Sequence, residues 1–352
     1  MNAAGLRAKS IAVIVCLAFA AAGCGGRATV RLRPKAPAKA AAGKKKALPA
    51  TLTISVVDAS TSEPLTNVPV AAGKRYLSTG AAGMAVPGNL TAGDITITAR
   101  APQHSIYRQS RHLQAGDNTV TIALSPESET PDSEPVVFRH KAYLTIDDGP
   151  SATWTPEVLD ILKREGVPAT FFVVGWRAAE RPDLVRRAYL EGNAIGNHTY
   201  SHDYGQLYRG SPRNLTASFA RNGLLLKNII GYAPTVTRPP GGAAGNFRPG
   251  WQSRVTGAGY TTVLWNVTTG DGSTRTTSSQ MVENAKTYLA RLKSPEPAVI
   301  LMHDIRPPIV KALPKIIAEV RRRGYEFSSV TDDLREPGVI IGPRRKLLPG
   351  RF

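Results

Sequence analysis

The feature that most constrains the fold is a regular alternation of strand-like and helix-like segments through the C-terminal part of the chain. Apolar strand patterns lie at residues 142–146, 169–174, 194–195, 235–238, 261–267, 299–303 and 325–328. Amphipathic helical patterns lie between them, at residues 156–165, 181–190, 214–230, 278–292 and 308–323. Such alternation implies a parallel sheet, either open or closed as a barrel. In both arrangements catalytic groups gather at the carboxyl ends of the strands.

Changes in composition predict further boundaries. The acidic, Pro/Ser-rich segment 126–137 reads as a linker, so we expect a catalytic α/β domain at 138–335 and a basic tail at 336–352. Before the linker, residues 51–125 contain short alternating strands separated by Gly- and Pro-rich turns, which predicts a small antiparallel all-β sandwich. The order of strands and glycines there resembles a carboxypeptidase-regulatory-like β-domain.

The N-terminus has the pattern of an export signal. A short segment with Arg7 and Lys9 precedes an apolar run at 11–22, which is too short to span a bilayer comfortably. The run leads directly into Cys24, and this resembles a bacterial lipoprotein signal in which residues 1–23 are removed and Cys24 is acylated. An ordinary secretory signal cleaved nearby is the alternative. We therefore expect an exported, membrane-anchored lipoprotein facing the periplasm or cell wall.

The net charge of +19 suggests a nucleic-acid-binding protein, but the distribution of the basic residues favours another partner. Eight of the 45 basic residues lie between Arg27 and Lys46 with no acidic residue among them, in an Ala/Pro/Lys-rich stretch that cannot form a core. No nucleic-acid-binding motif accompanies them. Residues 24–50 are therefore expected to be a flexible basic tether along an anionic wall or lipid surface, with a lipid anchor and no nucleic-acid partner.

A candidate metal site follows the first strand of the catalytic domain. Asp147 and Asp148 end the apolar run, and His198 and His202 follow about fifty residues later. Histidines at positions i and i+4 would project from one face of a helical turn, and one carboxylate completes a His₂-carboxylate set with an open position. The adjacent carboxylate could then act as a base. Taken alone, the Asp pair is more often a turn and the His pair more often a surface pair.

Three more polar residues follow the predicted strands. Arg238 ends the strand at 235–238 and could hold a carboxylate such as Asp147 ionised and oriented. Asp271 follows the strand at 261–267, and His303 ends the strand at 299–303. A histidine beside a metal pocket can serve as a general acid. Because all these residues lie at carboxyl strand ends, we expect them to meet at one edge of the sheet.

With these segments in this order, the region from Lys141 to Leu334 resembles the polysaccharide deacetylase family, also called the NodB homology domain or carbohydrate esterase family 4. Four of the family's five motifs are matched by Thr145–Pro150 (with Ile146 for phenylalanine), His198–His202, Arg238–Pro240 and Leu301–His303. The resemblance implies a distorted (β/α) barrel.

The resemblance also implies roles for individual residues. Asp147 would be the catalytic base and His303 the general acid, with Arg238 orienting the base and Asp271 tuning the acid. The metal ligands would be Asp148, His198 and His202, binding most readily Zn²⁺ and otherwise Co²⁺, Ni²⁺ or Mn²⁺. Residues expected to contact the substrate are Tyr200, Pro240, Gly241, Trp265 and Leu301.

The fourth motif departs from the family pattern Asp-x-x-Asp-Trp. Thr268 replaces the first aspartate and Gly272 the tryptophan, while Asp271 is retained. The partner of His303 is therefore kept, whereas one charge near the arginine and one wall of the substrate site are lost. This puts substrate preference in question more than catalysis.

The function that the resemblance implies is metal-dependent hydrolysis of N-acetyl groups from an N-acetylglucosamine-type polysaccharide of the cell envelope, with release of acetate. Peptidoglycan is the leading substrate because the lipid anchor and tether would hold the enzyme near the wall. Exopolysaccharide, chitin oligomers and O-acetylated xylan are alternatives within the same class. An inactive wall-binding module is the alternative from a different class.

Overall fold

The computed structural model describes residues 48–127, 141–293 and 296–330. The predicted signal segment 1–23, the lipidation site Cys24, the tail 336–352 and most of the tether and linker lie outside these residues, so the predictions for them stay open. The chain divides into two units, 1–46 and 47–352, and all the described residues belong to the second.

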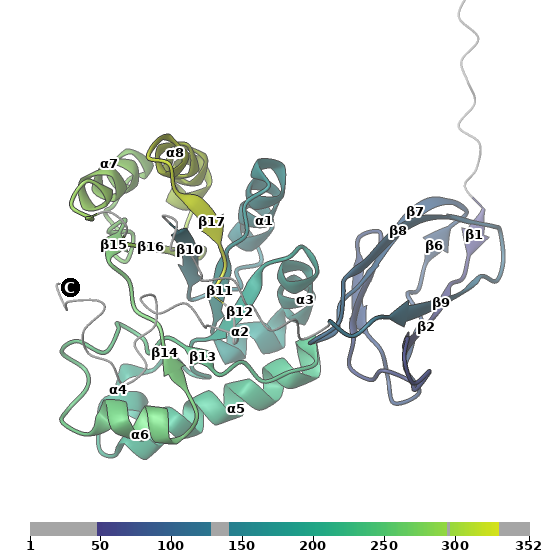
Figure 1. Ribbon diagram of the computed structural model, residues 1–352, viewed down its shortest axis with the longest axis horizontal. Coiled ribbons are helices and arrows are strands. Elements are labelled where there is room, and N and C mark those ends of the chain that lie inside the picture. Colours follow the sequence, from purple (N-terminus) through teal and green to yellow (C-terminus); the bar gives the residue numbers. More distant parts are fainter. Residues whose placement is uncertain (1–47, 128–140, 294–295, 331–352) are drawn as a thin grey trace, which may run out of the picture. The chain divides into compact units, whose positions relative to one another are not determined.

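The larger part of this unit is built on a parallel sheet of eight strands (Figure 1). Seven of them follow the order β14-β13-β12-β11-β10-β16-β15, and β17 also pairs with β10. The strands are β10 (Lys141–Asp147), β11 (Thr170–Val173), β12 (Ala194–Asn197), β13 (Val236–Thr237), β14 (Thr261–Thr262), β15 (Val267–Thr268), β16 (Ala298–His303) and β17 (Glu326–Ser328). The predicted distorted (β/α) barrel is confirmed.

The helices that connect these strands include all five that the amphipathic patterns predicted. They are α1 (Trp154–Glu165), α2 (Gly175–Glu180), α3 (Pro182–Leu190), α4 (Tyr204–Tyr208), α5 (Pro212–Ile230), α6 (Trp251–Gly257), α7 (Ser278–Leu289) and α8 (Pro308–Arg322). The additional helices α2, α4 and α6 are only five to seven residues long, too short for a clear apolar period. No helix in the described part of the chain has the length and apolar character needed to cross a membrane.

The core lies on both faces of the central strands. On one face Leu144, Ile146 and Ile300 pack against apolar side chains of α1, α7 and α8, whereas Tyr143 and Val299 are buried on the other. Strands covered on both faces read as continuous apolar runs, as these two do in the sequence. The site-bearing ends of β10 and β16 therefore rest on rigid, fully packed strands.

The single strand expected at 261–267 is wrong. The segment forms two short strands at opposite ends of the sheet, with β14 pairing with β13 and β15 pairing with β16. Between them the N–H groups of Val263 and Asn266 still donate to Thr237 and Val299 of the neighbouring strands, but two carbonyls bind a side chain. The carbonyls of Val263 and Leu264 accept hydrogen bonds from Arg238, and the Asn266 side chain bonds to the backbone of Pro297 and Val299.

Residues 49–124 form the predicted small all-β part, with nine short strands. They are β1 (Pro49–Ala50), β2 (Thr53–Asp58), β3 (Pro69–Ala72), β4 (Arg75–Ser78), β5 (Met84–Ala85), β6 (Leu90–Thr91), β7 (Gly93–Ala99), β8 (Tyr107–Leu113) and β9 (Thr119–Leu124). A four-stranded and a three-stranded sheet enclose a separate apolar core. The expectation of purely antiparallel pairing is wrong for one pair, because β2 and β9 are parallel.

Candidate active site

The carboxyl ends of the parallel strands bring the predicted polar residues to one edge of the sheet. Asp147 and His303 are the last residues of β10 and β16, and they are direct partners in the register of these two strands. His198 follows β12 immediately, and Arg238 follows β13. The expectation drawn from the βα alternation, that these residues meet, is confirmed by the structure.

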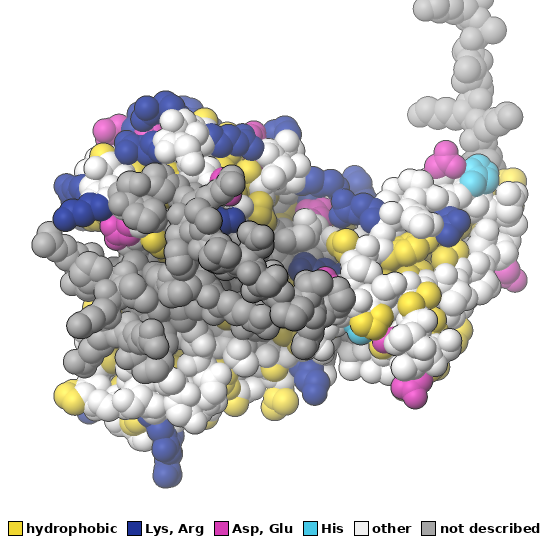
Figure 2. Space-filling view, viewed as in Figure 1, with side chains coloured by type: hydrophobic (Ala, Val, Ile, Leu, Met, Phe, Trp, Pro, Cys, Tyr) yellow, Lys and Arg dark blue, Asp and Glu magenta, His cyan; other side chains and the backbone are white. Residues whose placement is uncertain are grey.

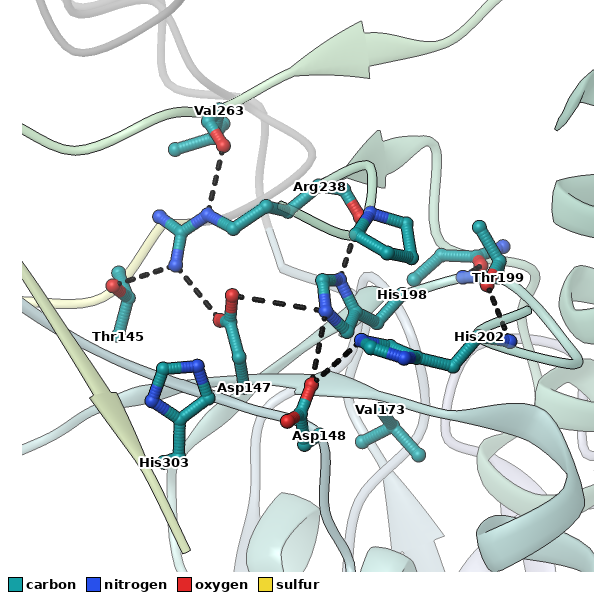
Figure 3. A network of polar contacts seen from close by, with 12 residues as sticks. Thr145, Asp147, Asp148, Val173, His198, Thr199, His202, Arg238, Val263 and His303 are labelled. Atoms are coloured by element: carbon teal, nitrogen blue, oxygen red, sulfur yellow. Dashed lines mark hydrogen bonds and ion pairs between the residues drawn. The ribbon is translucent and has the colours of Figure 1, made fainter. Parts of the chain in front are cut away.

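Asp148, His198 and His202 converge on one point (Figure 3). Their potential ligand atoms all lie within 4.8 Å of one another. Oδ1 of Asp148 is 3.2 Å from Nε2 of His198 and 3.0 Å from Nε2 of His202. Two imidazole nitrogens and one carboxylate oxygen form the donor set of a catalytic zinc site, so these residues fit a divalent metal ion.

The orientation of His198 is fixed by its other ring nitrogen. Nδ1 lies 2.6 Å from the backbone carbonyl oxygen of Arg238, which can only accept a hydrogen bond. Nδ1 therefore carries the proton, and the lone pair of Nε2 is directed toward Asp148. Such a contact to a ligating histidine sets its tautomer and raises its basicity toward a metal.

The two histidines do not lie on a helical turn, as their spacing suggested. Residues 198–202 form an irregular loop after β12, in which Thr199 and His202 have positive φ angles of 68° and 55°. Hydrogen bonds hold this shape, because Asn197 Oδ1 accepts from the Thr199 backbone N–H and Thr199 Oγ1 accepts from that of His202. The loop brings both Nε2 atoms to one carboxylate, so the ligand prediction does not depend on the helix.

Electrostatics favour the ionised form of Asp148. Burial alone would raise the pKa of this carboxyl, but the contacts with the imidazoles of His198 and His202 outweigh burial and hold the pKa well below its usual range. Asp148 also adopts a left-handed backbone conformation, with φ of +73°. A non-glycine residue keeps that conformation only where its surroundings impose it.

Asp147 is held apart from the three ligands by Arg238. Asp147 is 2% exposed and Arg238 is fully buried, and Nη1 of the arginine donates to Oδ1 of the carboxylate at 2.8 Å. The other carboxylate oxygen, Oδ2, lies 3.8 Å from Nε2 of His198. One oxygen is thus bound to the guanidinium while the other faces the metal ligands (Figure 3).

Three further N–H groups of Arg238 also donate hydrogen bonds. Nη1 donates to Thr145 Oγ1 at 2.8 Å, and Nε and Nη2 donate to the carbonyls of Val263 and Leu264 at 2.9 and 3.0 Å. The guanidinium also lies 4.2 Å from the ring centroid of Phe172. These neutral partners hold the arginine without a carboxylate at position 268, so four of its five N–H groups are bonded despite the substitution in the fourth motif.

His303 is bound to Asp271 through two atoms. Its Nδ1 lies 2.9 Å from Asp271 Oδ1, and its backbone N–H donates to Oδ2 at 2.8 Å. Burial alone would lower the pKa of His303, but the hydrogen bond and charge of Asp271 raise it to about 9. With Nδ1 held by the carboxylate, Nε2 is the nitrogen left to exchange a proton with a substrate.

The residues expected to contact substrate are only partly brought together. Gly241 and Trp265 line a cavity of about 460 Å³. Pro240 lies at the start of the same loop, and its carbonyl accepts from the Tyr208 hydroxyl. Leu301 is largely buried, at 7% exposure. Tyr200 instead stacks against Arg221 and lines a separate hollow, so the structure gives no support to its expected contact with substrate.

One buried group beside the site was not predicted. Asp304 directly follows His303, is fully buried, and accepts a short hydrogen bond from the Thr155 hydroxyl, while its Oδ1 has no partner among the described residues. A Cβ atom on Gly149 would come within 2.4 Å of this carboxyl, so Asp304 packs closely against the turn after Asp148. Burial raises its pKa to about 7. Its place beside the last motif was the available signal.

A family model described as polysaccharide deacetylase matches residues 137–263. A peptidoglycan-N-acetylglucosamine deacetylase from Bacillus cereus is 32% identical over 240 residues, covering 66% of this chain and 86% of that protein. A peptidoglycan-N-acetylmuramic acid deacetylase from Bacillus subtilis is 32% identical over 209 residues, covering 58% of this chain and 40% of that protein.

Solved structures give the same relationship. The crystal structure of a polysaccharide deacetylase from Bacillus cereus aligns with a TM-score of 0.52 at 34% identity, covering 56% of this chain and 96% of that one. The match in sequence, fold and motif order has one explanation: the chain belongs to the polysaccharide deacetylase family.

Proposed function

We propose that this protein is a metal-dependent deacetylase that hydrolyses N-acetyl groups of an N-acetylglucosamine-type polysaccharide, with peptidoglycan as its leading substrate. The observation that carries the proposal is the division of labour between two adjacent carboxylates. Asp148 faces His198 and His202, whereas Asp147 is bound to Arg238 and lies beside His303.

Asp148, His198 and His202 would hold the metal, with the Nδ1 proton of His198 fixed by the Arg238 carbonyl. When bound there, a divalent ion polarises an acetamide carbonyl and lowers the pKa of a water molecule, and Zn²⁺ is the ion expected from this donor set. Co²⁺, Ni²⁺ and Mn²⁺ can occupy similar sites.

The protons are moved by two residues of the chain. Asp147 accepts a proton from the attacking water as the new C–O bond forms, and the guanidinium of Arg238 keeps the carboxylate oriented. His303 donates a proton to the sugar nitrogen as the C–N bond breaks, because its pKa of about 9 keeps it protonated near neutral pH. The products are acetate and a free amino sugar.

Two further observations support an envelope glycan as the substrate. Both sequence relatives described above act on peptidoglycan according to their names. On the face drawn in Figure 2, Lys and Arg side chains gather where Figure 1 places α7 and α8. Exposed basic residues there are Lys286, Arg291, Lys293, Lys311, Lys315, Arg321 and Arg322. Such a surface suits an anionic wall.

The location that we propose follows from the sequence alone. A signal segment at 1–23, acylation of Cys24 and a basic tether would place the catalytic part outside the cytoplasmic membrane, within reach of the wall. Acylation can be tested by mass spectrometry of the purified N-terminal peptide, in which a lipid modification on Cys24 is the expected result.

The two carboxylates provide the test of the function. We expect Asp147→Asn to keep its metal but to lose acetate release by about 10²- to 10⁴-fold, the usual contribution of a general base. Asp148→Asn should instead weaken metal affinity by at least about 10- to 100-fold. Metal content and acetate release from peptidoglycan should be measured on both variants. Undiminished turnover by Asp147→Asn would show that this residue is not the base.

A further inference from the structure

The loops that follow β15 and β16 meet beside His303 through residues that the proposed chemistry does not use. Arg306 lies between β16 and α8, and its Nη2 donates to the backbone carbonyl of Gly272 at 2.9 Å. Gly272 itself directly follows Asp271, the partner of His303. Arg306 is therefore bonded to the residue next to Asp271, and Asp271 binds the histidine that would protonate the leaving amine.

Gly272 leaves space next to His303. A Cβ atom at this position would lie 3.9 Å from Cε1 of His303, and no side chain occupies that direction because the residue is glycine. Gly272 and its hydrogen bond to Arg306 are exposed. A group attached to the substrate can thus approach the Nη2 side of the guanidinium from solvent while the acetamide lies near His303.

Arg306 retains capacity for an anion. Its Nη1 is shielded from water and has no hydrogen-bond partner in the described ranges. A shielded donor without a partner is unusual in a folded protein. Guanidinium groups bind carboxylates through two parallel hydrogen bonds, with both charge and geometry contributing.

We propose that Arg306 binds a carboxylate carried by the glycan close to the acetylated sugar, so that the enzyme favours anionic acetylated glycans over neutral ones. This inference rests on the proposed deacetylase function and narrows its substrate class. The lactyl group of N-acetylmuramic acid carries such a carboxylate, and so does a stem peptide attached to it. Chitin oligomers carry none.

The test compares glycans with and without this carboxylate. Three forms of one muramic-acid-containing glycan fragment are used: with the lactyl carboxylate free, with it converted to a methylamide, and with a stem peptide. Chitopentaose is the neutral reference. The full chain, loaded with metal, is assayed for acetate release as wild type, Arg306→Gln and Arg275→Gln. Arg275 is an exposed arginine on the same loop as Gly272 and serves as the matched control.

We expect Arg306→Gln to lower kcat/KM about 10- to 100-fold on the free-carboxylate fragment, the range for a charge-assisted hydrogen bond. Turnover of the methylamide and of chitopentaose should stay within about twofold of wild type, and Arg275→Gln should change neither. A loss on the stem-peptide fragment alone would assign the carboxylate to the peptide. Equal effects on charged and neutral fragments would overturn the inference. If wild type releases acetate from no substrate, the proposed function itself fails.

Discussion

His303, the proposed proton donor, is held by a single carboxylate that forms hydrogen bonds with two of its atoms. Asp271 binds both the Nδ1 and the backbone nitrogen of His303, and Thr269 in turn donates to Asp271 at 2.8 Å. The pKa of His303 is about 9 because Asp271 outweighs the effect of burial. A general acid must be protonated to act, so activity should fall as the pH rises through this value.

Removing the charge of Asp271 should move that fall to lower pH. In Asp271→Asn, burial still lowers the pKa of His303 while the main opposing charge is gone. The descending limb of kcat/KM against pH should therefore shift from about 9 toward neutrality. Asp94→Asn is the matched control, because it breaks an exposed His–Asp contact with His112 in the β-strand part. A limb that stays in place in Asp271→Asn would exclude His303 as the acid.

At the scale of elements, the two carboxylates lie where β10 ends and the turn toward α1 begins. A chain of hydrogen bonds supports this turn: the Ser151 backbone N–H donates to Thr155 Oγ1, and the Thr155 hydroxyl donates to Asp304. The helix start and the end of β16 are thereby tied to a turn whose Asp148 has a left-handed conformation. We infer that this chain of bonds keeps the turn in its metal-binding shape.

Thr155→Val should show what this support contributes. The valine cannot bond to Asp304 or Ser151, so a buried carboxyl and a part-buried backbone N–H lose their partner at a cost of about 1–3 kcal/mol in the free energy of unfolding. Metal affinity should weaken by about 10-fold or more. Thr153→Val, in the same helix start but exposed and without a capping bond, should change either quantity little. Equal metal affinity in the two variants would show that these hydrogen bonds do not contribute to metal binding.

For the whole molecule, the sequence predicted the features that depend on periodicity and on strand ends. The βα alternation predicted a parallel sheet, and that sheet places Asp147, His198, Arg238 and His303 at one edge. This works because strands covered on both faces have a strong apolar signal, and because parallel strands all end on the same side.

The sequence could not predict features that depend on tertiary hydrogen bonds. The break inside residues 261–267 arises because the Arg238 side chain takes the carbonyls that a strand would use. The loop at 198–202 follows from backbone angles that Asn197 and Thr199 stabilise. Asp304 has a role only once Thr155 and Gly149 are packed against it. The partners of Arg238 and Asp304 lie far away in the sequence, whereas the bonds of the 198–202 loop are local but depend on positive φ angles that its residue types do not signal.

The most direct test of the central claim is acetate release by the full chain before and after removal of its metal. The chain is incubated with peptidoglycan, a poly-N-acetylglucosamine exopolysaccharide, chitin oligomers and O-acetylated xylan, first as isolated, then after chelation, then with Zn²⁺ restored. We expect release from peptidoglycan that chelation abolishes and Zn²⁺ recovers, because Asp148, His198 and His202 form the donor set for that ion. Release that survives complete removal of metal, or no release from any glycan in the zinc-loaded protein, would contradict the account.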